Sequence, residues 1–265
     1  MPKISVIIPV YGVEQYIEKC ARSLFEQTLD DIEYIFIDDC TPDSSIEILK
    51  RVLKEYPNRQ SQVHIHKMES NSGQAAVRKW GIENAKGQFL IHCDSDDWID
   101  AEAYQYCYNE AINNNSDIVF FDFEVIEGKK TVKRHRNIPN NKQDILRYLV
   151  SGQLMGSLCG MLVKRSLYDK IIFYPKDNLC EDLVMSIQLI NEANKFSYIR
   201  KHFYHYFQSS QSITSKGTFE KAQSNFIQSY NNTELILKYL HNIGMDTFLK
   251  YEILTRKLIN VKTLY

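Results

Sequence analysis

Residues 4–10 read ISVIIPV, an apolar run that is rich in β-branched side chains and is followed by Tyr11 and Gly12. Such a run is typical of a strand that is buried on both faces of a sheet. Three further apolar runs follow within the first hundred residues, namely YIFID at 34–38, VHIHK at 63–67 and FLIHC at 89–93. The first hundred residues therefore contain four predicted strands.

The segments between these runs have the spacing of amphipathic helices. Apolar side chains recur every three or four residues over 14–27 and 46–53, and a third helix is predicted over 74–85. Strands that alternate with helices form parallel βαβ units with right-handed crossovers, and the helices cover both faces of the sheet. We therefore predict an α/β fold.

After residue 98 the pattern becomes mixed. No flexible linker separates this half from the first, so it is interpreted as an extension of the same sheet. We expect a first half over 1–98, a second half of the same domain over 99–215 and a helical extension over 216–265. The expected elements are helices at 101–114, 142–150 and 183–193, strands at 118–125, 131–134, 158–163, 196–199 and 203–207, and helical structure from 218 to the end.

The composition excludes several classes of protein. Of the 265 residues, 44% are hydrophobic and 25% are charged, which is typical of a globular chain and excludes a largely disordered one. The net charge of −1 argues against a dedicated nucleic-acid binder. The sequence shows no signal peptide and no apolar run of about 18 residues, and its six cysteines form no C-x-x-C pair. We expect a cytoplasmic chain with reduced thiols.

An acidic cluster, Asp94-Ser95-Asp96-Asp97, follows the fourth predicted strand directly. Neighbouring carboxylates repel one another, and the repulsion is relieved when a cation binds them. Mg²⁺ and Mn²⁺ prefer oxygen ligands and often join a carboxylate to a substrate phosphate. At the carboxyl end of a strand in an α/β sheet, a metal–diphosphate site is the favoured interpretation over a solvated loop that caps the next helix.

Two further polar groups lie where ligands bind in such folds. Asp38 and Asp39 follow the second strand, and they fit either a polar turn or a carboxylate that accepts hydrogen bonds from a nucleobase or ribose. Gly73 and Arg78 open the third helix, whose N-terminus favours an anion. Arg78 fits either a phosphate clamp or a surface arginine.

Together these pieces resemble the family 2 glycosyltransferases, which have the GT-A fold. The resemblance covers about residues 3–215 and is carried by motifs in the family's order. The matching stretches are ISVIIPVYGVEQYIEKCARSLFEQT, YIFIDDCTPDSS, NSGQAAVRKWGIENAKGQFLIHCDSDDW and CEDLVMSIQL. The implied fold is a Rossmann-like nucleotide-diphospho-sugar transferase with a mixed, mostly parallel sheet, here followed by a C-terminal helical extension.

The resemblance also implies roles for individual residues. Pro9 and Tyr11 match positions that border the base, and Asp39 matches the carboxylate that reads its edge. The remaining matches are Gly73 and Arg78 near the base and diphosphate, Asp96 facing the ribose and metal, Asp97 as the direct metal ligand, and Asp182 as the general base. Asp182 also fits a helix N-terminal carboxylate that interacts with the macrodipole, and both readings can hold together.

The implied activity is inverting transfer of a sugar, with Mn²⁺ or Mg²⁺ as cofactor, from a nucleotide-diphospho-sugar such as a UDP-sugar. The implied acceptor is a glycan or lipid-linked glycan, in synthesis of a surface polysaccharide. The alternative is a non-catalytic nucleotide- or glycan-binding module on the same fold, and a phospho-receiver built on Asp38 and Asp39 is a further rival. We expect no nucleic-acid partner.

Three features bear on partners. Basic residues gather at a predicted hairpin, which fits either a charged sheet edge or an anionic acceptor or lipid headgroup at the inner face of a membrane. His205 lies between aromatic residues and fits either a core position or a late metal contact. The apolar face of the last helix is a candidate homodimer contact. The basic residues are Lys129, Lys130, Lys133, Arg134 and Arg136.

Overall fold

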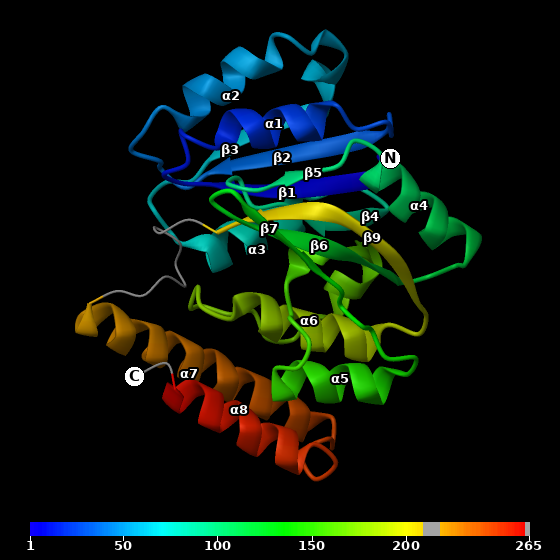
Figure 1. Ribbon diagram of the computed structural model, residues 1–265, viewed down its shortest axis with the longest axis vertical. Helices are drawn as coiled ribbons and strands as arrows, with labels where there is room; N and C mark the ends of the chain where they lie inside the picture. The colour runs from blue at the N-terminus through cyan, green and yellow to red at the C-terminus, as the bar shows by residue number, and fades with distance from the viewer. Residues whose placement is uncertain (209–217, 263–265) are drawn as a thin grey trace. The chain divides into compact units, whose positions relative to one another are not determined.

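The sheet of the computed structural model contains the four strands predicted from the first hundred residues (Figure 1). All four pair in parallel, in the order β3-β2-β1-β4. The structure describes residues 1–208 and 218–262, with only the backbone of 260–262. The strands are β1 (Ile4–Val10), β2 (Ile32–Asp38), β3 (Val63–Lys67) and β4 (Phe89–His92).

The chain divides into two compact units. The first is built from Met1–His135, Cys159–Asp169 and Asn194–Gln208, and it holds every described strand together with helices α1 to α4. The second comprises Arg136–Leu158, Lys170–Ala193 and Ser209–Tyr265 and holds helices α5 to α8. The three-part division at residues 98 and 215 stays a prediction, and its second boundary lies outside the described residues. The helices are α1 (Ile17–Phe25), α2 (Ser45–Leu53), α3 (Gln74–Asn84), α4 (Ala103–Asn113), α5 (Lys142–Ser151), α6 (Glu181–Glu192), α7 (Phe219–Asn242) and α8 (Lys250–Lys262).

Helices cover both faces of the parallel strands, as predicted. The even-numbered apolar side chains of β1 pack in one core cluster with side chains of α1 and α2. The opposite face of β1 meets α3, where a Cβ placed on Gly81 would lie 2.6 Å from Cγ2 of Ile7. Since successive side chains of a strand point to opposite faces, this alternation places α3 across the sheet from α1.

The second half of the chain adds its strands to the same sheet. The full order is β3-β2-β1-β4-β8-β6-β9-β5, and β7 pairs with β6. Strand β8 is antiparallel to β4 and β6, whereas β9 is parallel to β6. The sheet is therefore mixed, which confirms the predicted fold class. The added strands are β5 (Trp98–Ile99), β6 (Ile118–Glu127), β7 (Lys130–Arg134), β8 (Met161–Lys164) and β9 (Phe196–Phe207).

The structure differs from the predicted elements in three places. The two short strands expected at 196–199 and 203–207 form one strand, β9, because its pairing with β6 continues across register shifts that absorb the residues between them. The strand expected at 158–163 begins only at Met161, after a short 3₁₀ turn. The two-residue strand β5 was not predicted, since two residues carry no periodicity.

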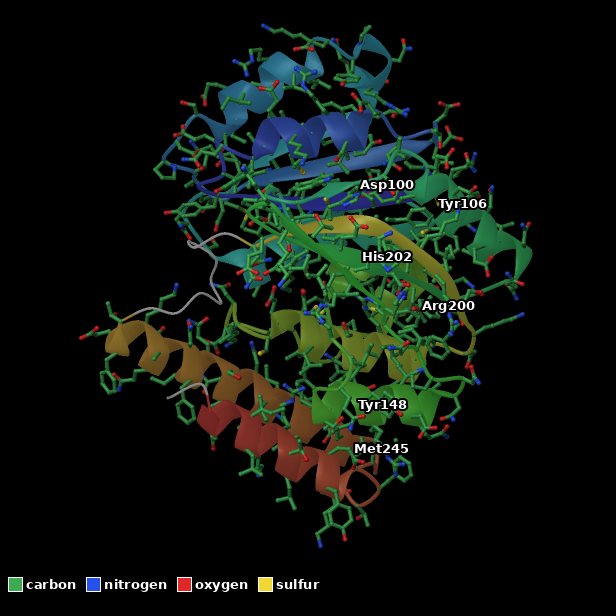
Figure 2. The ribbon with its side chains drawn as sticks, in the orientation of Figure 1. Asp100, Tyr106, Tyr148, Arg200, His202 and Met245 are labelled. Atoms are coloured by element: carbon green, nitrogen blue, oxygen red, sulfur yellow. The ribbon has the colours of Figure 1, made fainter. Side chains whose placement is uncertain are left out.

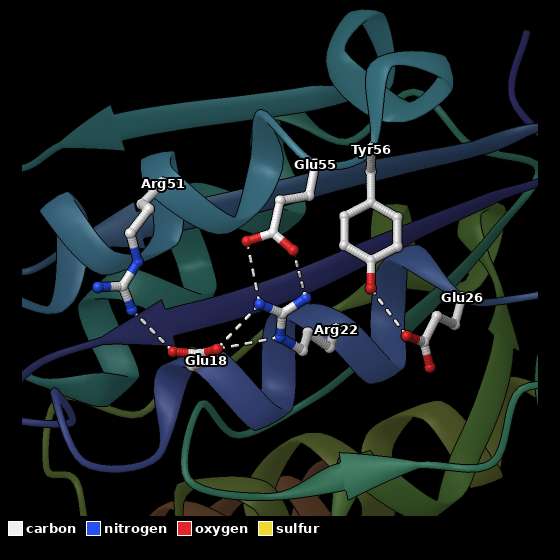
Figure 3. A network of polar contacts seen from close by, with 6 residues as sticks. All are labelled: Glu18, Arg22, Glu26, Arg51, Glu55 and Tyr56. Atoms are coloured by element: carbon white, nitrogen blue, oxygen red, sulfur yellow. Dashed lines mark hydrogen bonds and ion pairs between the residues drawn. The ribbon is translucent and has the colours of Figure 1, made fainter.

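Polar side chains join α1 to α2 on the outer surface (Figure 3). The guanidinium of Arg22 donates to both oxygens of Glu55, at 2.8 and 3.0 Å, and also to Glu18. Arg51 donates to the other oxygen of Glu18 at 2.8 Å. Exposed ion pairs contribute little individually, so this network mainly fixes how the two helices lie side by side.

In the second unit, α5 packs against α6 and α8, and α7 packs against α6 and α8. Helix α5 starts at Asn141, whose side chain accepts from the amide of Asp144 at 2.8 Å, and it ends at Gly152 in the left-handed region. The buried guanidinium of Arg256 on α8 donates to the carbonyls of Leu149 and Val150. Both carbonyls lie in the last turn of α5, and that of Leu149 also accepts the amide of Gly152.

Hydropathy separates these helices from membrane-spanning ones. None of the helices in residues 1–208 and 218–262 is both long and apolar enough to cross a lipid bilayer.

We predict that Gly87→Ala lowers the free energy of unfolding by about 2–4 kcal/mol. A Cβ at this position would lie 2.4 Å from the amide nitrogen of Ser5 and 2.7 Å from the carbonyl carbon of Ile4, and backbone atoms of a central strand cannot move aside cheaply. Gly128→Ala is the matched control. Its Cβ would meet nothing within 4 Å. Only the positive φ at this position disfavours alanine, so we expect the free energy of unfolding to fall by about 1 kcal/mol. Equal losses in chemical denaturation would contradict the steric account.

Candidate functional site

Polar side chains gather where three neighbouring strands of the first unit end. Strands β2, β1 and β4 are adjacent and parallel, so their carboxyl ends share one edge of the sheet. Asp39 follows β2, Tyr11 follows β1 and Asp94 follows β4. The ring of Tyr11 is half exposed, whereas Asp39 is buried. Ligands of open α/β sheets bind at this edge, so the structure brings these three predicted site residues to one place.

The loops after β1 and β2 are held together by hydrogen bonds. The amide of Gly12 donates to Oγ1 of Thr41 at 2.8 Å, and the amide of Glu14 donates to the carboxylate of Asp43 at 2.9 Å. Gly12 and Cys40 both have a positive φ, at 67° and 58°. A left-handed conformation is rare for a residue that carries a side chain, so the turn at Cys40 depends on the surrounding contacts. These hydrogen bonds fix the backbone of the loop that contains Tyr11.

Asp39 holds the segment that leads into α3. Its two carboxylate oxygens accept the amides of Ser72 and Gly73, at 2.7 and 2.9 Å. Gly73 is the N-cap residue of α3 and has a φ of 83°, a conformation that glycine adopts without strain. Each oxygen keeps one lone pair beyond these bonds, so Asp39 can still accept a bond from a ligand.

The first turns of α3 face the acidic cluster. Nη2 of Arg78 lies 2.7 Å from Oδ1 of Asp94, and Nε2 of Gln74 lies 3.3 Å from the same oxygen. Arg78 is only 3% exposed, so it is no surface arginine. Its ion pair with Asp94 offsets part of the negative charge of the cluster and fixes α3 against the end of β4.

Asp97 forms hydrogen bonds with strand β9. Its buried carboxylate accepts the hydroxyl of Tyr204 at 2.6 Å and the backbone amide of Phe207 at 2.7 Å. The same Tyr204 oxygen accepts the amide of Asp94 at 3.1 Å. The carboxyl end of β9 therefore closes over the acidic loop. Tyr204 was not predicted as a site residue. It lies in an aromatic strand, and no sequence pattern relates that strand to the aspartates.

Asp96 is the carboxylate that the protein leaves most open. Among the described residues, its own backbone amide is the group that acts to lower its pKa. Burial raises the pKa of Asp96 to about 6, and the neighbouring charge of Asp94 contributes in the same direction. Burial also raises the pKa of Asp97 well above its usual value, together with repulsion from Asp96 and Asp94 and against the bonds from Tyr204 and Phe207.

These groups fit a divalent cation. Mg²⁺ and Mn²⁺ prefer oxygen ligands, and the carboxylates of Asp96 and Asp97 have pKa values raised by burial and by the neighbouring negative charges. Both oxygens of Asp97 already accept one hydrogen bond each, but each keeps a lone pair, so Asp96 and Asp97 can both offer an oxygen to a cation. The metal-ligand roles expected of these two residues stay predictions, and the structure adds that Asp97 also anchors β9.

Asp182 lies in the second unit, in the first turn of α6. The segment before this helix is held by α7. Nδ2 of the buried Asn232 donates to the carbonyls of Asp177 and Leu179, at 2.9 and 2.8 Å, and Oε1 of Gln228 accepts the amide of Leu179. Asn232 and Gln228 are one helical turn apart and were not predicted as site residues, because their contacts depend on how α7 packs.

The other predicted site residues have clear positions. Pro9 lies half-buried near the end of β1. His205 stacks on Trp98 at 5.4 Å between ring centres, and its two ring nitrogens lie 2.8 Å from Asp100 and 3.3 Å from Glu124. Its contacts are therefore carboxylates and an aromatic ring of the first unit.

The basic hairpin is only partly as expected. Gly128 turns β6 into β7, and most of the basic side chains of the hairpin are exposed. Arg136 is an exception, because it is 6% exposed and donates to the carbonyls of Met155 and Ser157 in the second unit. It was wrongly counted as a surface charge, since sequence alone does not show which basic residue turns inward.

Comparison with known proteins gives a family match. The sequence model of the family described as glycosyl transferase family 2 matches residues 5–172. The chain is 34% identical over 209 residues to the poly(ribitol-phosphate) beta-glucosyltransferase of Bacillus spizizenii, covering 77% of this chain and 32% of that protein. It is 28% identical over 266 residues to the cholesterol galactosyltransferase of Borreliella burgdorferi, covering 94% and 73%. The chain thus spans about a third of the first relative's length.

Solved structures show the same fold. The crystal structure of Staphylococcus aureus TarS 1-349 superposes with a TM-score of 0.73 at 22% identity, covering 96% of this chain and 71% of that one. The mannosyltransferase PcManGT of Pyrobaculum calidifontis, solved with GDP-Man and Mn²⁺, superposes with a TM-score of 0.67 at 16% identity, covering 99% and 72%.

We predict that Asp96→Asn stabilises the metal-free protein at pH 7.5 by about 2–3 kcal/mol. The pKa of Asp96 rises from 3.8 to about 6 on folding. Its contribution to stability is therefore full below pH 3.8 and is lost as the pH rises through 6. The gain in the variant should shrink toward zero near pH 4 in chemical denaturation with a chelator present. Exposed Asp30→Asn is the control, and an Asp96→Asn gain that does not change with pH would contradict the burial of this charge.

We expect Tyr204→Phe to lower the free energy of unfolding by about 1–3 kcal/mol, because a buried carboxylate oxygen of Asp97 loses its donor. The variant should also lose most of the rise in Tm that Mn²⁺ gives the wild type. Tyr34→Phe is the matched control, since its buried hydroxyl donates to the carbonyl of Leu24 and not to the acidic loop. It should lose stability but keep the Mn²⁺ effect, and equal Mn²⁺ responses in the two variants would overturn the assignment.

Proposed function

The chain belongs to glycosyl transferase family 2, and we propose that it transfers a sugar from a nucleotide-diphospho-sugar to a hydroxyl group with inversion at the anomeric carbon. The observation that carries the proposal is the acidic loop at the end of β4. Burial raises the pKa of Asp96 and Asp97, and the loop lies at the sheet edge that also presents Tyr11 and Asp39. A cluster of this kind destabilises the folded protein unless a cation binds it.

The first unit supplies the groups that would hold the nucleotide. Tyr11 offers an exposed ring for stacking on the base, and Asp39 keeps lone pairs for the base edge. Gly73 and Arg78 lie beside them at the start of α3, with Arg78 directed to Asp94. We propose that Asp96 contacts the ribose and is the first ligand of Mn²⁺ or Mg²⁺, and that Asp97 adds a second oxygen. When bound, the cation neutralises the charge that develops on the leaving diphosphate.

Asp182 is proposed as the general base. Its carboxylate would take the proton of the acceptor hydroxyl while that oxygen forms its bond to the anomeric carbon and the bond from this carbon to the diphosphate oxygen breaks. The position of Asp182 in the first turn of α6 suits a stable carboxylate, because the helix N-terminus favours negative charge. Alignment of the hydroxyl with the anomeric carbon supplies a further large part of the rate.

The relatives support a class of donor and acceptor. TarS has been solved with UDP and with UDP-GlcNAc, and the Bacillus relative acts on poly(ribitol-phosphate) by its name. We propose a UDP-sugar as donor and a surface polysaccharide or lipid-linked glycan as acceptor. The exposed basic side chains of the β6–β7 hairpin would suit an anionic acceptor or the headgroups at the inner face of a membrane.

We predict that Asp182→Asn abolishes sugar transfer, by about 10²-fold or more, and leaves the affinity for UDP with Mn²⁺ within about twofold of the wild type. Asp97→Ala should instead lose the Mn²⁺-dependent part of UDP binding together with transfer. Turnover of a UDP-sugar, followed by UDP release, and calorimetric titration with UDP measure the two effects. Asp169→Asn, at an exposed position of the first unit, is the control.

Each outcome has a separate meaning. Normal turnover by Asp182→Asn would remove the base assignment without touching the nucleotide site. UDP binding that ignores Mn²⁺ in the wild type would remove the cation site. Tight binding with no transfer to any acceptor would favour a non-catalytic nucleotide-binding module.

A further inference from the structure

A second cluster of metal-ligating side chains lies on the sheet, outside the acidic loop. It consists of Asp122 on β6, His135 just after β7 and His202 on β9. One ligand atom from each lies within 4.8 Å of the other two. None of the three belongs to the groups assigned above to the nucleotide, the cation or the base.

The strand pairing brings the three side chains together. Asp122 pairs with His202 in the β6–β9 ladder, and Phe123 pairs with Arg134 in the antiparallel β6–β7 ladder. Continuing that ladder by one residue places His135 opposite Asp122. Figure 2 shows His202 and the neighbouring Arg200 on β9. The ladder shifts register on both sides of the Asp122–His202 pair, and such bulges commonly redirect a side chain.

The distances fit a cation held by three ligands. Oδ2 of Asp122 lies 2.7 Å from Nδ1 of His135 and 4.0 Å from Nε2 of His202. A tetrahedral zinc ion with bonds of about 2.0–2.1 Å separates its ligand atoms by about 3.3 Å, which lies between these two values. Shifts of about 0.6–0.7 Å in the two imidazole nitrogens relative to Oδ2 of Asp122 would bring both distances to this value.

The surroundings of the cluster also resemble those of metal sites. The hydroxyl of Tyr198 donates to Oδ1 of the fully buried Asp122, which orients the carboxylate and leaves Oδ2 directed at the histidines. Nε2 of His202 is buried and has no hydrogen-bond partner among the described residues, a costly state for a polar atom. The side chain of His135 is 54% exposed and gives an ion a path from solvent.

From this geometry we infer a structural site for a divalent transition metal of the zinc class at Asp122, His135 and His202, with its fourth position open to water. Imidazole nitrogens favour such ions, whereas the all-oxygen loop at Asp94–Asp97 favours Mg²⁺ and Mn²⁺. On β6, Asp122 lies four residues before Ile126, which pairs with Phe207 of β9. This separation is roughly 13 Å along the strand. The bound ion would fasten the β6–β7 hairpin to β9.

The test is titration of Zn²⁺ into the full chain with Mg²⁺ in excess, so that the acidic loop holds the harder ion. The wild type should bind one Zn²⁺ per chain and gain a few degrees in Tm. His135→Gln with His202→Gln should weaken binding by at least about 100-fold. His241→Gln is the matched control, because His241 forms an exposed pair with Asp246 at 3.0 Å and should leave binding unchanged.

Unaltered protein gives an independent readout. Of the seven histidines, Zn²⁺ should shift the imidazole NMR signals of only His135 and His202, and Co²⁺ should give the visible absorption of a tetrahedral site. The NMR shifts and the Co²⁺ absorption test the metal site even where the double variant fails to fold. Equal zinc affinity in the wild type and the double variant, or shifts spread over all exposed histidines, would overturn the inference and leave Asp122 as a buried carboxylate in contact with His135 and the hydroxyl of Tyr198.

Discussion

The bond between Tyr204 and Asp97 is the contact on which the candidate site depends. Residues 107 positions apart in sequence meet there, and the same tyrosine oxygen also accepts the amide of Asp94. A second bond, from the amide of Phe207, holds the other oxygen of Asp97. The carboxyl end of β9 is therefore fixed to the loop that follows β4. This anchor opposes the mutual repulsion of the carboxylates in the acidic loop.

The loop at residues 94–97 concentrates negative charge, which lowers the stability of the folded protein. Burial raises the pKa of both Asp96 and Asp97, and the guanidinium of Arg78 pairs with Asp94 at 2.7 Å. Functional sites commonly hold charges that destabilise the empty protein and that a ligand then compensates. The family to which the chain belongs gives this charge a use in our proposal, namely a cation that carries a nucleotide diphosphate.

Much of the first unit could be predicted from sequence because its strands are short apolar runs. The bounds of β1 and β3 were predicted without error, since polar and turn-forming residues flank them. In contrast, β9 was divided into two strands because Arg200 and Lys201 interrupt its aromatic pattern, and the bulge that absorbs them is visible only in the pairing. The aspartates of the site were found from their place after strands. Tyr204 was not, because its role arises from a contact across the sheet.

The most direct measurement is the anomalous scattering of manganese in crystals soaked with UDP and Mn²⁺. Our account predicts one strong peak at bonding distance, about 2.1 Å, from a carboxylate oxygen of Asp96, with the base of UDP against Tyr11. A peak at the Asp122 cluster alone, or no peak near residues 94–97 while UDP is bound, would contradict it.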